Sequence, residues 1–236
     1  MKKSLILLLS LLYFAEGFTQ NPKREFPARM WPLVKKEKVN EARLMSEIIP
    51  DYPQEYYSKI LNYVSVDITA MCDGKMITSK SKSDVLTDEQ KNMLVNADLG
   101  MDVIIEIKFQ YKDPANDICG GGGKIKSMNM GVTVVPETEA EYPGGFKQIP
   151  IDLAKNVISK ISDTITSEKV RLAIVTFAVN EQGKIVNAKI TKSSTSDEVD
   201  KLLLEAASNM QNWIPAQNSK GIKVKQEFCV RFRSGC

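Results

Sequence analysis

The order of hydrophobic patterns between residues 142 and 232 is the sequence feature that most constrains the fold. Val199 starts an apolar series at i, i+3, i+4, i+7 and i+11, the spacing of one helix face. Alternation of apolar and polar residues, which indicates half-buried strands, occurs on both sides of this series. Helices and strands are therefore expected, in chain order, at 146–157, 169–179, 184–191, 199–210 and 222–232. This helix, strand, strand, helix, strand order predicts an α+β domain with one sheet and helices on one face, in two layers.

Cap and turn residues mark the limits of these elements. Thr195-Ser196-Asp197-Glu198 is a capping box at the start of the second helix. Pro150 falls within the first helical pattern, so that helix is expected to be short or to hold Pro150 in its first turn. The domain is assigned to residues 137–232, and residues 233–236 form a short tail.

A separate, mostly β domain is predicted at residues 58–135, ahead of an acidic boundary that begins at Pro136. Tyr63–Thr69 alternates like a half-buried strand, and Asp73-Gly74 predicts a tight turn after it. Thr87-Asp88-Glu89-Gln90 is a capping box, which predicts a short helix. Two further strands are expected before the boundary.

Residues 21–57 are expected to be an irregular, partly extended arm. They hold Pro22, Pro27, Pro32, Pro50 and Pro53, which is half of the ten prolines in the chain. A short helix is expected within the arm, at about 37–48.

The first twenty residues are predicted to be a signal peptide. Lys2 and Lys3 form a positive start, Leu5–Ala15 is an apolar core, and Ala15-Glu16-Gly17 offers small residues for cleavage. This apolar run is shorter than the ~20 residues of a spanning helix. The mature protein is therefore predicted to be periplasmic or secreted. The alternative is an uncleaved anchor in the inner membrane.

Composition argues for a globular protein and against several classes of function. The chain is 43% hydrophobic and 26% charged, and its net charge of +3 is too balanced to indicate a nucleic-acid partner. It has no histidine, which excludes Ser-His-Asp and Cys-His nucleophiles and HExxH zinc motifs. The glycines at 120–123 lack the Ser or Thr of a phosphate-binding loop, because Ile125 stands there. We assign no catalytic residue, metal ligand or cofactor, and predict a protein that is not an enzyme.

The four cysteines are Cys72, Cys119, Cys229 and Cys236. Four cysteines allow three disulfide connectivities, and sequence alone does not choose among them. A Cys72–Cys119 bridge within the first domain is one interpretation. Buried or tail thiols are the other, because free cysteine is often a core residue.

Four features of residues 137–232 resemble, in the same order, the carboxy-terminal domain of the TonB-family energy transducers. They are the run Tyr142-Pro143-Gly144-Gly145, the hairpin Phe177-x-Val179-x-x-x-Gly183, the pair Trp213-x-Pro215 after the second helix, and the closing strand at 223–232. Their physical roles are structural. Trp213 is expected to be a core anchor that holds the helix on the sheet. Gly144, Gly145 and Gly183 are expected to give backbone freedom at turns.

The resemblance implies a sheet in which the third strand pairs with the first and keeps its outer edge open. An open edge presents unpaired N–H and C=O groups, to which an extended segment can add as another strand. In the family, this is how a transducer binds a short peptide of an outer-membrane receptor, the TonB box. Carried over, the partner-binding residues are Ile222, Lys223, Val224, Lys225, Gln226, Glu227, Phe228 and Arg231. The basic side chains either contribute to binding or protect the edge from aggregation.

The predicted function is that of a periplasmic TonB-like protein that binds an extended segment of an outer-membrane receptor or another envelope partner. A link to TonB-dependent transport is what the resemblance implies. One alternative is a structural adaptor that dimerises or scaffolds envelope partners. Another is an energy transducer with an uncleaved anchor. The family's transducers carry an anchoring helix that typically contains a histidine, so a chain without histidine favours the binding role.

Overall fold

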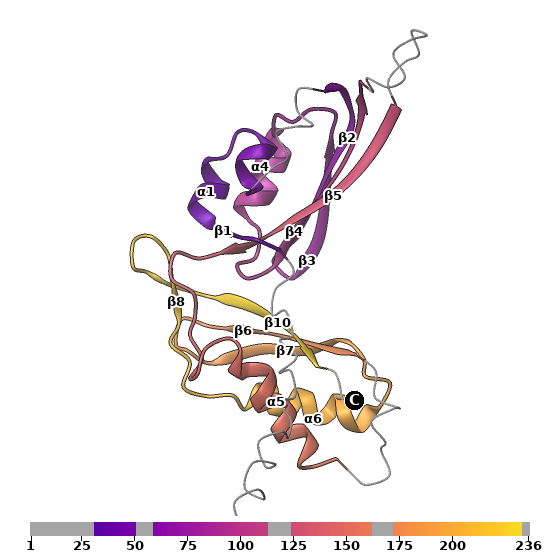
Figure 1. Cartoon of the computed structure of the whole chain (residues 1–236). Coiled ribbons are helices and arrows are strands. Elements are labelled where there is room, and N and C mark those ends of the chain that lie inside the picture. Colours follow the sequence, from indigo (N-terminus) through magenta and orange to yellow (C-terminus); the bar gives the residue numbers. More distant parts are fainter. Residues whose placement is uncertain (1–30, 51–58, 113–123, 162–171, 233–236) are drawn as a thin grey trace, which may run out of the picture.

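The computed structural model describes residues 31–50, 59–112, 124–161 and 172–232. They form two main β-sheets, each covered by helices over a hydrophobic core, and a third sheet of two short strands (Figure 1). We call residues 31–135 the N-terminal unit and residues 137–232 the C-terminal unit. The predicted α+β class is confirmed. The predicted signal peptide, Cys119 and the 233–236 tail lie outside the described residues.

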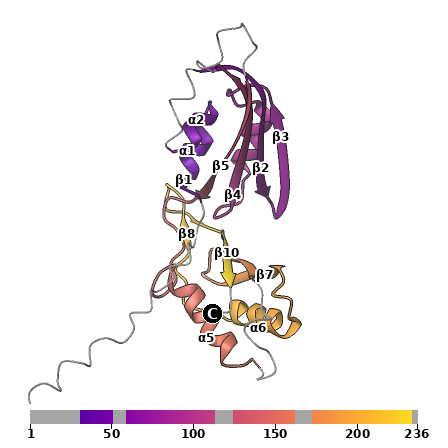
Figure 2. The ribbon, with the colours of Figure 1, turned by 45° about the vertical axis from the view of Figure 1, so that its right-hand side comes forward.

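The N-terminal unit contains a five-stranded sheet. Its strands are β1 (Leu33–Lys35), β2 (Ile60–Cys72), β3 (Lys75–Ser81), β4 (Asp102–Tyr111) and β5 (Lys124–Val135). Their order across the sheet is β1-β5-β4-β2-β3, and only the β1–β5 pair is parallel. The helices are α1 (Lys36–Glu41), α2 (Met45–Ile48) and α4 (Asp88–Val95). Figure 2 shows α1 and α2 on one side of this sheet.

Residues 33–49 belong to the N-terminal unit, which corrects the prediction of an arm for this part of 21–57. β1 extends the sheet alongside β5, with Leu33 opposite Thr133. Val39, Met45 and Ile48 are buried in the core of the unit. The single predicted helix is two short helices separated by three residues. Such short elements show little periodicity, so their burial depends on tertiary contacts that the local pattern does not reveal.

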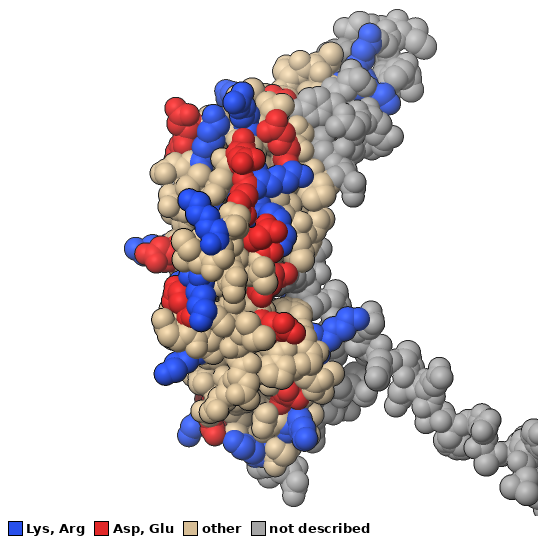
Figure 3. All heavy atoms as spheres, turned by 90° about the vertical axis from the view of Figure 1, so that its left-hand side faces the viewer, with Lys and Arg blue, Asp and Glu red and all other residues tan. Residues whose placement is uncertain are grey.

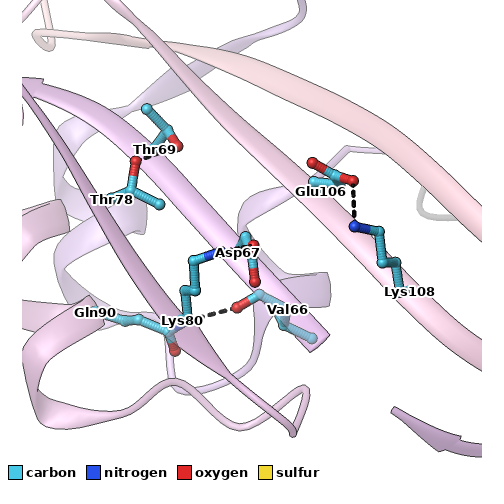
Figure 4. Close-up of polar contacts among 8 residues, drawn as sticks. All are labelled: Val66, Asp67, Thr69, Thr78, Lys80, Gln90, Glu106 and Lys108. Carbon is cyan, nitrogen blue, oxygen red and sulfur yellow. Dashed lines mark hydrogen bonds and ion pairs between the residues drawn. The ribbon is translucent and has the colours of Figure 1, made fainter. Parts of the chain in front are cut away.

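The capping box predicted at Thr87 is confirmed and also attaches α4 to the sheet. The Thr87 hydroxyl accepts from the Gln90 amide at 3.2 Å, and Gln90 Oε1 accepts from the Thr87 amide at 3.1 Å. Gln90 Nε2 donates to the carbonyl of Val66 in β2 at 3.2 Å (Figure 4). At the other end of α4, Lys36 Nζ donates to the carbonyls of Leu94 and Ala97. Both ends of α4 are therefore held by polar contacts.

The face of the N-terminal sheet away from the helices carries short-range polar pairs (Figure 4). Lys80 Nζ lies 2.8 Å from the Asp67 carboxylate, and the hydroxyls of Thr69 and Thr78 are also 2.8 Å apart. Cross-strand pairs of this kind contribute roughly 0.2–1 kcal/mol each. They therefore add little to the stability of the unit, whereas the opposite apolar face supplies the core.

The C-terminal unit has the predicted order of helix, strand, strand, helix, strand. These elements are α5 (Gln148–Ile158), β6 (Ala173–Val179), β7 (Ile185–Lys192), α6 (Asp197–Ser208) and β10 (Gln226–Phe232). The sheet order is β10-β6-β7, antiparallel throughout. α5 packs on β10, whereas α6 packs on β6 and β7 (Figure 1). β8 (Ala216–Gln217) and β9 (Lys223–Val224) pair with each other as a separate two-stranded ribbon.

Both helices of the C-terminal unit bury one stripe under the sheet. α5 buries Ile149, Leu153 and Val157, which are four residues apart, and it holds Pro150 within its first turn as predicted. The N-cap of α6 lies one residue later than predicted. Ser196, and not Thr195, is the N-cap, and its hydroxyl accepts from the Val199 amide. Thr195 has φ +72°, which is not the extended backbone that an N-cap needs.

The acidic linker after Pro136 is joined to the C-terminal unit by main-chain hydrogen bonds. Thr138 exchanges two main-chain hydrogen bonds with Gln217, and Glu141 exchanges two with Ile214. From the other unit, Lys35 Nζ donates to the carbonyls of Pro136 and Glu137. The linker is therefore held from both sides.

Candidate functional site

The strand β10 forms one edge of the C-terminal sheet. It pairs with β6 from Gln226 opposite Val179 to Phe232 opposite Ala173. Alternate side chains are 4% exposed or less and face the helices: Gln226, Phe228, Val230 and Phe232. The Glu227 amide bonds outside the sheet, to the Leu99 carbonyl. Since the direction of N–H and C=O alternates along a strand, Glu227, Cys229 and Arg231 turn these groups away from β6. These outward groups are the ones that a further strand could use.

Gln226 fixes the start of β10 from inside the fold. Its Oε1 accepts a hydrogen bond of 2.8 Å from the Ala140 amide, and its Nε2 donates to the Glu139 carboxylate at 2.9 Å. Its side chain is fully buried, and its main chain faces β6. The structure therefore gives Gln226 a role in joining the linker to the strand, and the outer edge is presented by its neighbours.

The outer edge of β10 is occupied at one position by the N-terminal unit. The Glu227 amide donates a 2.7 Å hydrogen bond to the carbonyl of Leu99, in the loop between α4 and β4. Gly100 follows with φ +88°, and a Cβ placed there would lie 1.9 Å from the Glu227 carbonyl oxygen. Only glycine permits this approach. The expectation of an open edge is thus wrong at Glu227.

A cleft of about 200 Å³ lies between the two units beside this contact. The N-terminal unit contributes Asp73 and Asp98 to its lining, and the C-terminal unit contributes Lys189 and Lys225. The Asp98 carboxylate accepts from the amides of Asp73 and Gly74, so it braces the β2–β3 turn. Glu227 also lines the C-terminal wall and pairs with Lys225, and Asp98 and Asp73 attract Lys225 across the cleft.

Two polar groups in this cleft have distinct environments. Lys225 Nζ lies 3.2 Å from the Glu227 carboxylate. Partial burial lowers the pKa of Lys225, but the hydrogen bond and ion pair with Glu227 outweigh it, so the pKa is raised and the side chain stays charged. Thr176 is 7% exposed, and its hydroxyl has no hydrogen-bond partner among the described residues.

The residues that carry the family resemblance come together around Trp213. Its ring lies 5.0 Å from Tyr142, 5.9 Å from Phe177 and 4.8 Å from Phe228, measured between centroids. Gly183, at φ +72°, approaches so closely that a Cβ there would lie 2.4 Å from the Trp213 carbonyl oxygen, with Pro215 also within 4 Å. Trp213 is buried, as expected of a core anchor.

The turn that enters the C-terminal unit has the predicted backbone. The Gly145 amide donates to the Tyr142 carbonyl at 2.7 Å, and Gly144 and Gly145 have φ of +82° and +78°. Pro143, between them and Tyr142, is exposed. The Tyr142 hydroxyl donates to the Asp152 carboxylate of α5 at 2.8 Å. The motif therefore joins the turn, helix, hairpin and last strand in one cluster.

The predicted last strand at 222–232 is divided in two, which corrects the candidate set. Lys223 and Val224 form β9 and pair with β8, and exposed Ile222 precedes them. Lys225 separates β9 from β10. The predicted residues Ile222, Lys223, Val224 and Lys225 are consequently not part of the three-stranded edge, because the chain changes partner strand at Lys225.

Cys72 is a buried thiol at the end of β2, and its Sγ donates to the Met93 carbonyl at 3.4 Å. Cys119 lies outside the described residues, so the Cys72–Cys119 bridge stays a prediction beside the alternative of free thiols.

Sequence reasoning missed Leu99, Gly100 and Cys229 as residues of this edge. A glycine just after a helix is a common sign of helix termination, so Gly100 gave no signal of a long-range contact. The alternation of β10 could have identified Cys229, because it shares the parity of Glu227 and Arg231. Burial raises the pKa of the Cys229 thiol; Arg231 opposes that shift and Asp102 adds to it.

No family model, curated protein or solved structure matches the chain. Among the described residues, no helix is both long enough and apolar enough to cross a membrane. The same residues contain no group of three or more side chains suited to a metal ion. The face in Figure 3 mixes Lys and Arg with Asp and Glu, and neither sign gathers on it.

Proposed function

We propose that this chain is a TonB-like protein of the periplasm that binds an extended segment of an envelope partner by strand addition to β10. The carrying observation is the position of β10 at the edge of its sheet, next to β6 alone. Main-chain groups at such an edge give affinity to any extended segment, and neighbouring side chains give selectivity. By the resemblance, the partner is an outer-membrane receptor, and binding is linked to TonB-dependent transport.

The part of the edge beyond the Leu99 contact begins at Cys229. Within the part of the chain that the structure describes, the outward amide of Cys229 has no main-chain acceptor. A bound segment that uses only the outward groups of Cys229 and Arg231 would form a short ladder with β10. A longer segment would also have to accept the hydrogen bond that the Glu227 amide now donates to Leu99, so we expect binding to displace the Leu99 loop.

The test measures binding of fluorescent decapeptides that cover the amino-terminal segments of outer-membrane receptors. Cys229→Pro removes the outward amide hydrogen, and proline is tolerated at the outward positions of an edge strand. We expect Cys229→Pro to weaken binding about tenfold or more, because it deletes one main-chain hydrogen bond and blocks the approach of the peptide. Cys229→Ser, which keeps the amide, is the matched control. Equal affinity of the two variants would exclude strand addition at this edge.

The alternative of a structural adaptor is favoured by one specific contact. The Glu227 amide already holds the N-terminal unit through Leu99, so the edge serves to join units within the chain. An adaptor would use the remaining edge to pair with a second copy. Light scattering after size exclusion decides between these functions, because a dimer that is lost in Cys229→Pro but kept in Cys229→Ser supports the adaptor.

A further inference from the structure

The two units repeat one topology. In the N-terminal unit, helices precede the β2–β3 hairpin, α4 follows it, and β4 returns to pair with β2. In the C-terminal unit, α5 precedes the β6–β7 hairpin, α6 follows it, and β10 returns to pair with β6. The helix that follows the hairpin packs on both strands of that hairpin in each unit. β4 and β10 are therefore equivalent strands.

The units differ at the outer edge of these equivalent strands. β5 covers the edge of β4 with ten residue pairs, from Asp102 opposite Thr133 to Tyr111 opposite Lys124. Beside β10, the described residues place only the Leu99 loop. The N-terminal unit thus shows how a strand completes this topology.

The strand β5 completes the core of its unit with alternate apolar side chains. Four of them lie in or against that core, separated by other residues: Met128, Met130, Val132 and Val134. Met130 and Val132 pair across to Ile105 and Val103 of β4, which are buried. A strand in this position therefore covers the helix-side flank of the sheet as well as supplying hydrogen bonds.

The equivalent flank of the C-terminal unit is apolar and exposed. Ile151 and Ile158, seven residues apart on α5, form one stripe and are 56% and 63% exposed. Asn156 lines the cleft between α5 and α6, and at ~100° per residue the two isoleucines lie about 140–160° round the helix from it. Because α5 packs under β10, this stripe lies on the side where a strand beside β10 would run.

We infer that the partner of β10 is an extended segment with apolar residues at every second position, which covers Ile151 and Ile158 as β5 covers its own unit. This inference rests on the proposed function and specifies the chemistry of the partner. β5 itself is not the occupant, because it is already paired with β4 from Lys124 to Thr133 and with β1 from Thr133 to Val135. We assign the occupant to a segment of another protein.

The probe is a labelled decapeptide with the sequence of residues 126–135, which carries the β5 pattern. Its control has serine at the four apolar positions equivalent to 128, 130, 132 and 134. Fluorescence anisotropy with the full chain is expected to show tighter binding of the first peptide by about tenfold or more, since several apolar side chains are buried.

The protein variant that tests the flank is the double substitution Ile151→Lys and Ile158→Lys. Both side chains are exposed, so the fold is expected to persist, and circular dichroism verifies it. We expect affinity for the first peptide to fall about tenfold. The matched control is Val95→Lys with Ile214→Lys, which adds the same charge at residues 46% and 58% exposed. This control is expected to retain the parent affinity within about twofold.

Failure of the inference is distinct from failure of strand addition. If both peptides bind equally and both double variants behave alike, while Cys229→Pro still abolishes binding, the edge binds strands and the apolar pattern is wrong. Absence of binding of either probe up to about 1 mM, a level set by weak complexes, also overturns the inference. The proposed strand addition to β10 is then tested separately, by the binding of receptor peptides to Cys229→Pro and Cys229→Ser. Self-association lost in Ile151→Lys and Ile158→Lys would instead identify a second copy as the occupant and overturn the inference.

Discussion

The amide of Glu227 in β10 donates a hydrogen bond of 2.7 Å to the carbonyl of Leu99, 128 positions earlier in the chain (227 − 99). This bond joins the edge strand of the C-terminal unit to a loop of the N-terminal unit. The neighbouring Gly100 makes the approach possible, and the charged walls of the cleft lie beside it. The edge that we propose for binding is therefore also a contact between the units.

Gly100→Ala is expected to separate the units at this contact. The new Cβ would overlap the Glu227 carbonyl oxygen at 1.9 Å, and the left-handed backbone would add about 1–2 kcal/mol of strain. Gly74→Ala is the matched control, because Gly74 also has φ +71° but nothing within 4 Å of its Cβ. Urea denaturation should show a loss of stability for Gly100→Ala that exceeds the control by about 1–3 kcal/mol. Equal losses would contradict the contact.

Ser196→Ala is expected to destabilise α6 by about 1 kcal/mol, because the Ser196 hydroxyl caps the Val199 amide. Thr195→Gly should be neutral or stabilising, since glycine adopts the positive φ of this position without strain. Thermal unfolding followed by circular dichroism compares the two variants. If Thr195→Gly were the more damaging, the N-cap would be Thr195 as the sequence first indicated.

Gln226→Ala is expected to cost about 2–3 kcal/mol. It leaves the buried Ala140 amide without its acceptor and removes the donor to Glu139. Gln182→Ala, at an exposed turn residue, is the control and should change stability by less than about 0.5 kcal/mol. The free energy of unfolding in urea measures both. A loss below about 1 kcal/mol for Gln226→Ala would show that this side chain does not hold the linker.

Tyr142 is expected to titrate late in the folded protein. Burial and the hydrogen bond to Asp152 raise the pKa of its phenol to about 12. Because the folded pKa lies above the ordinary value of 10.0, this group stabilises the fold below pH 10 and loses that contribution between pH 10 and 12. Ultraviolet titration of phenolate should show a late step that is missing in Tyr142→Phe. A parent protein without this step would contradict the assignment.

Local patterns predicted the elements whose cause is local. The alternation around Phe177, the spacing of Val199 and Leu203, and the Thr87 capping box all depend on residues close in sequence, and the structure contains the corresponding elements. Trp213 was expected in the core for its size and apolar character, and it is buried there.

Long-range contacts account for the errors. β1 gains its strand conformation from parallel pairing with β5, about a hundred residues away, and its three residues carry no pattern of their own. The chain leaves β9 at Lys225 because Val224 pairs with Ala216, whereas Gln226 pairs with Val179. For the candidate site, the alternation of residues in 226–232 was enough to predict that Glu227, Cys229 and Arg231 form one set. The Leu99 contact could not be predicted, since it depends on how two units dock.

The Glu227 amide has one proton to donate, and this gives the Leu99 contact a thermodynamic consequence. A partner strand that reaches Glu227 competes with Leu99, so each weakens the other by the same free energy. The strength of the contact between units therefore sets a threshold for ligand affinity. Substitutions in the α4–β4 loop, remote from any ligand, would then tune binding in the direction opposite to their effect on the docking of the units.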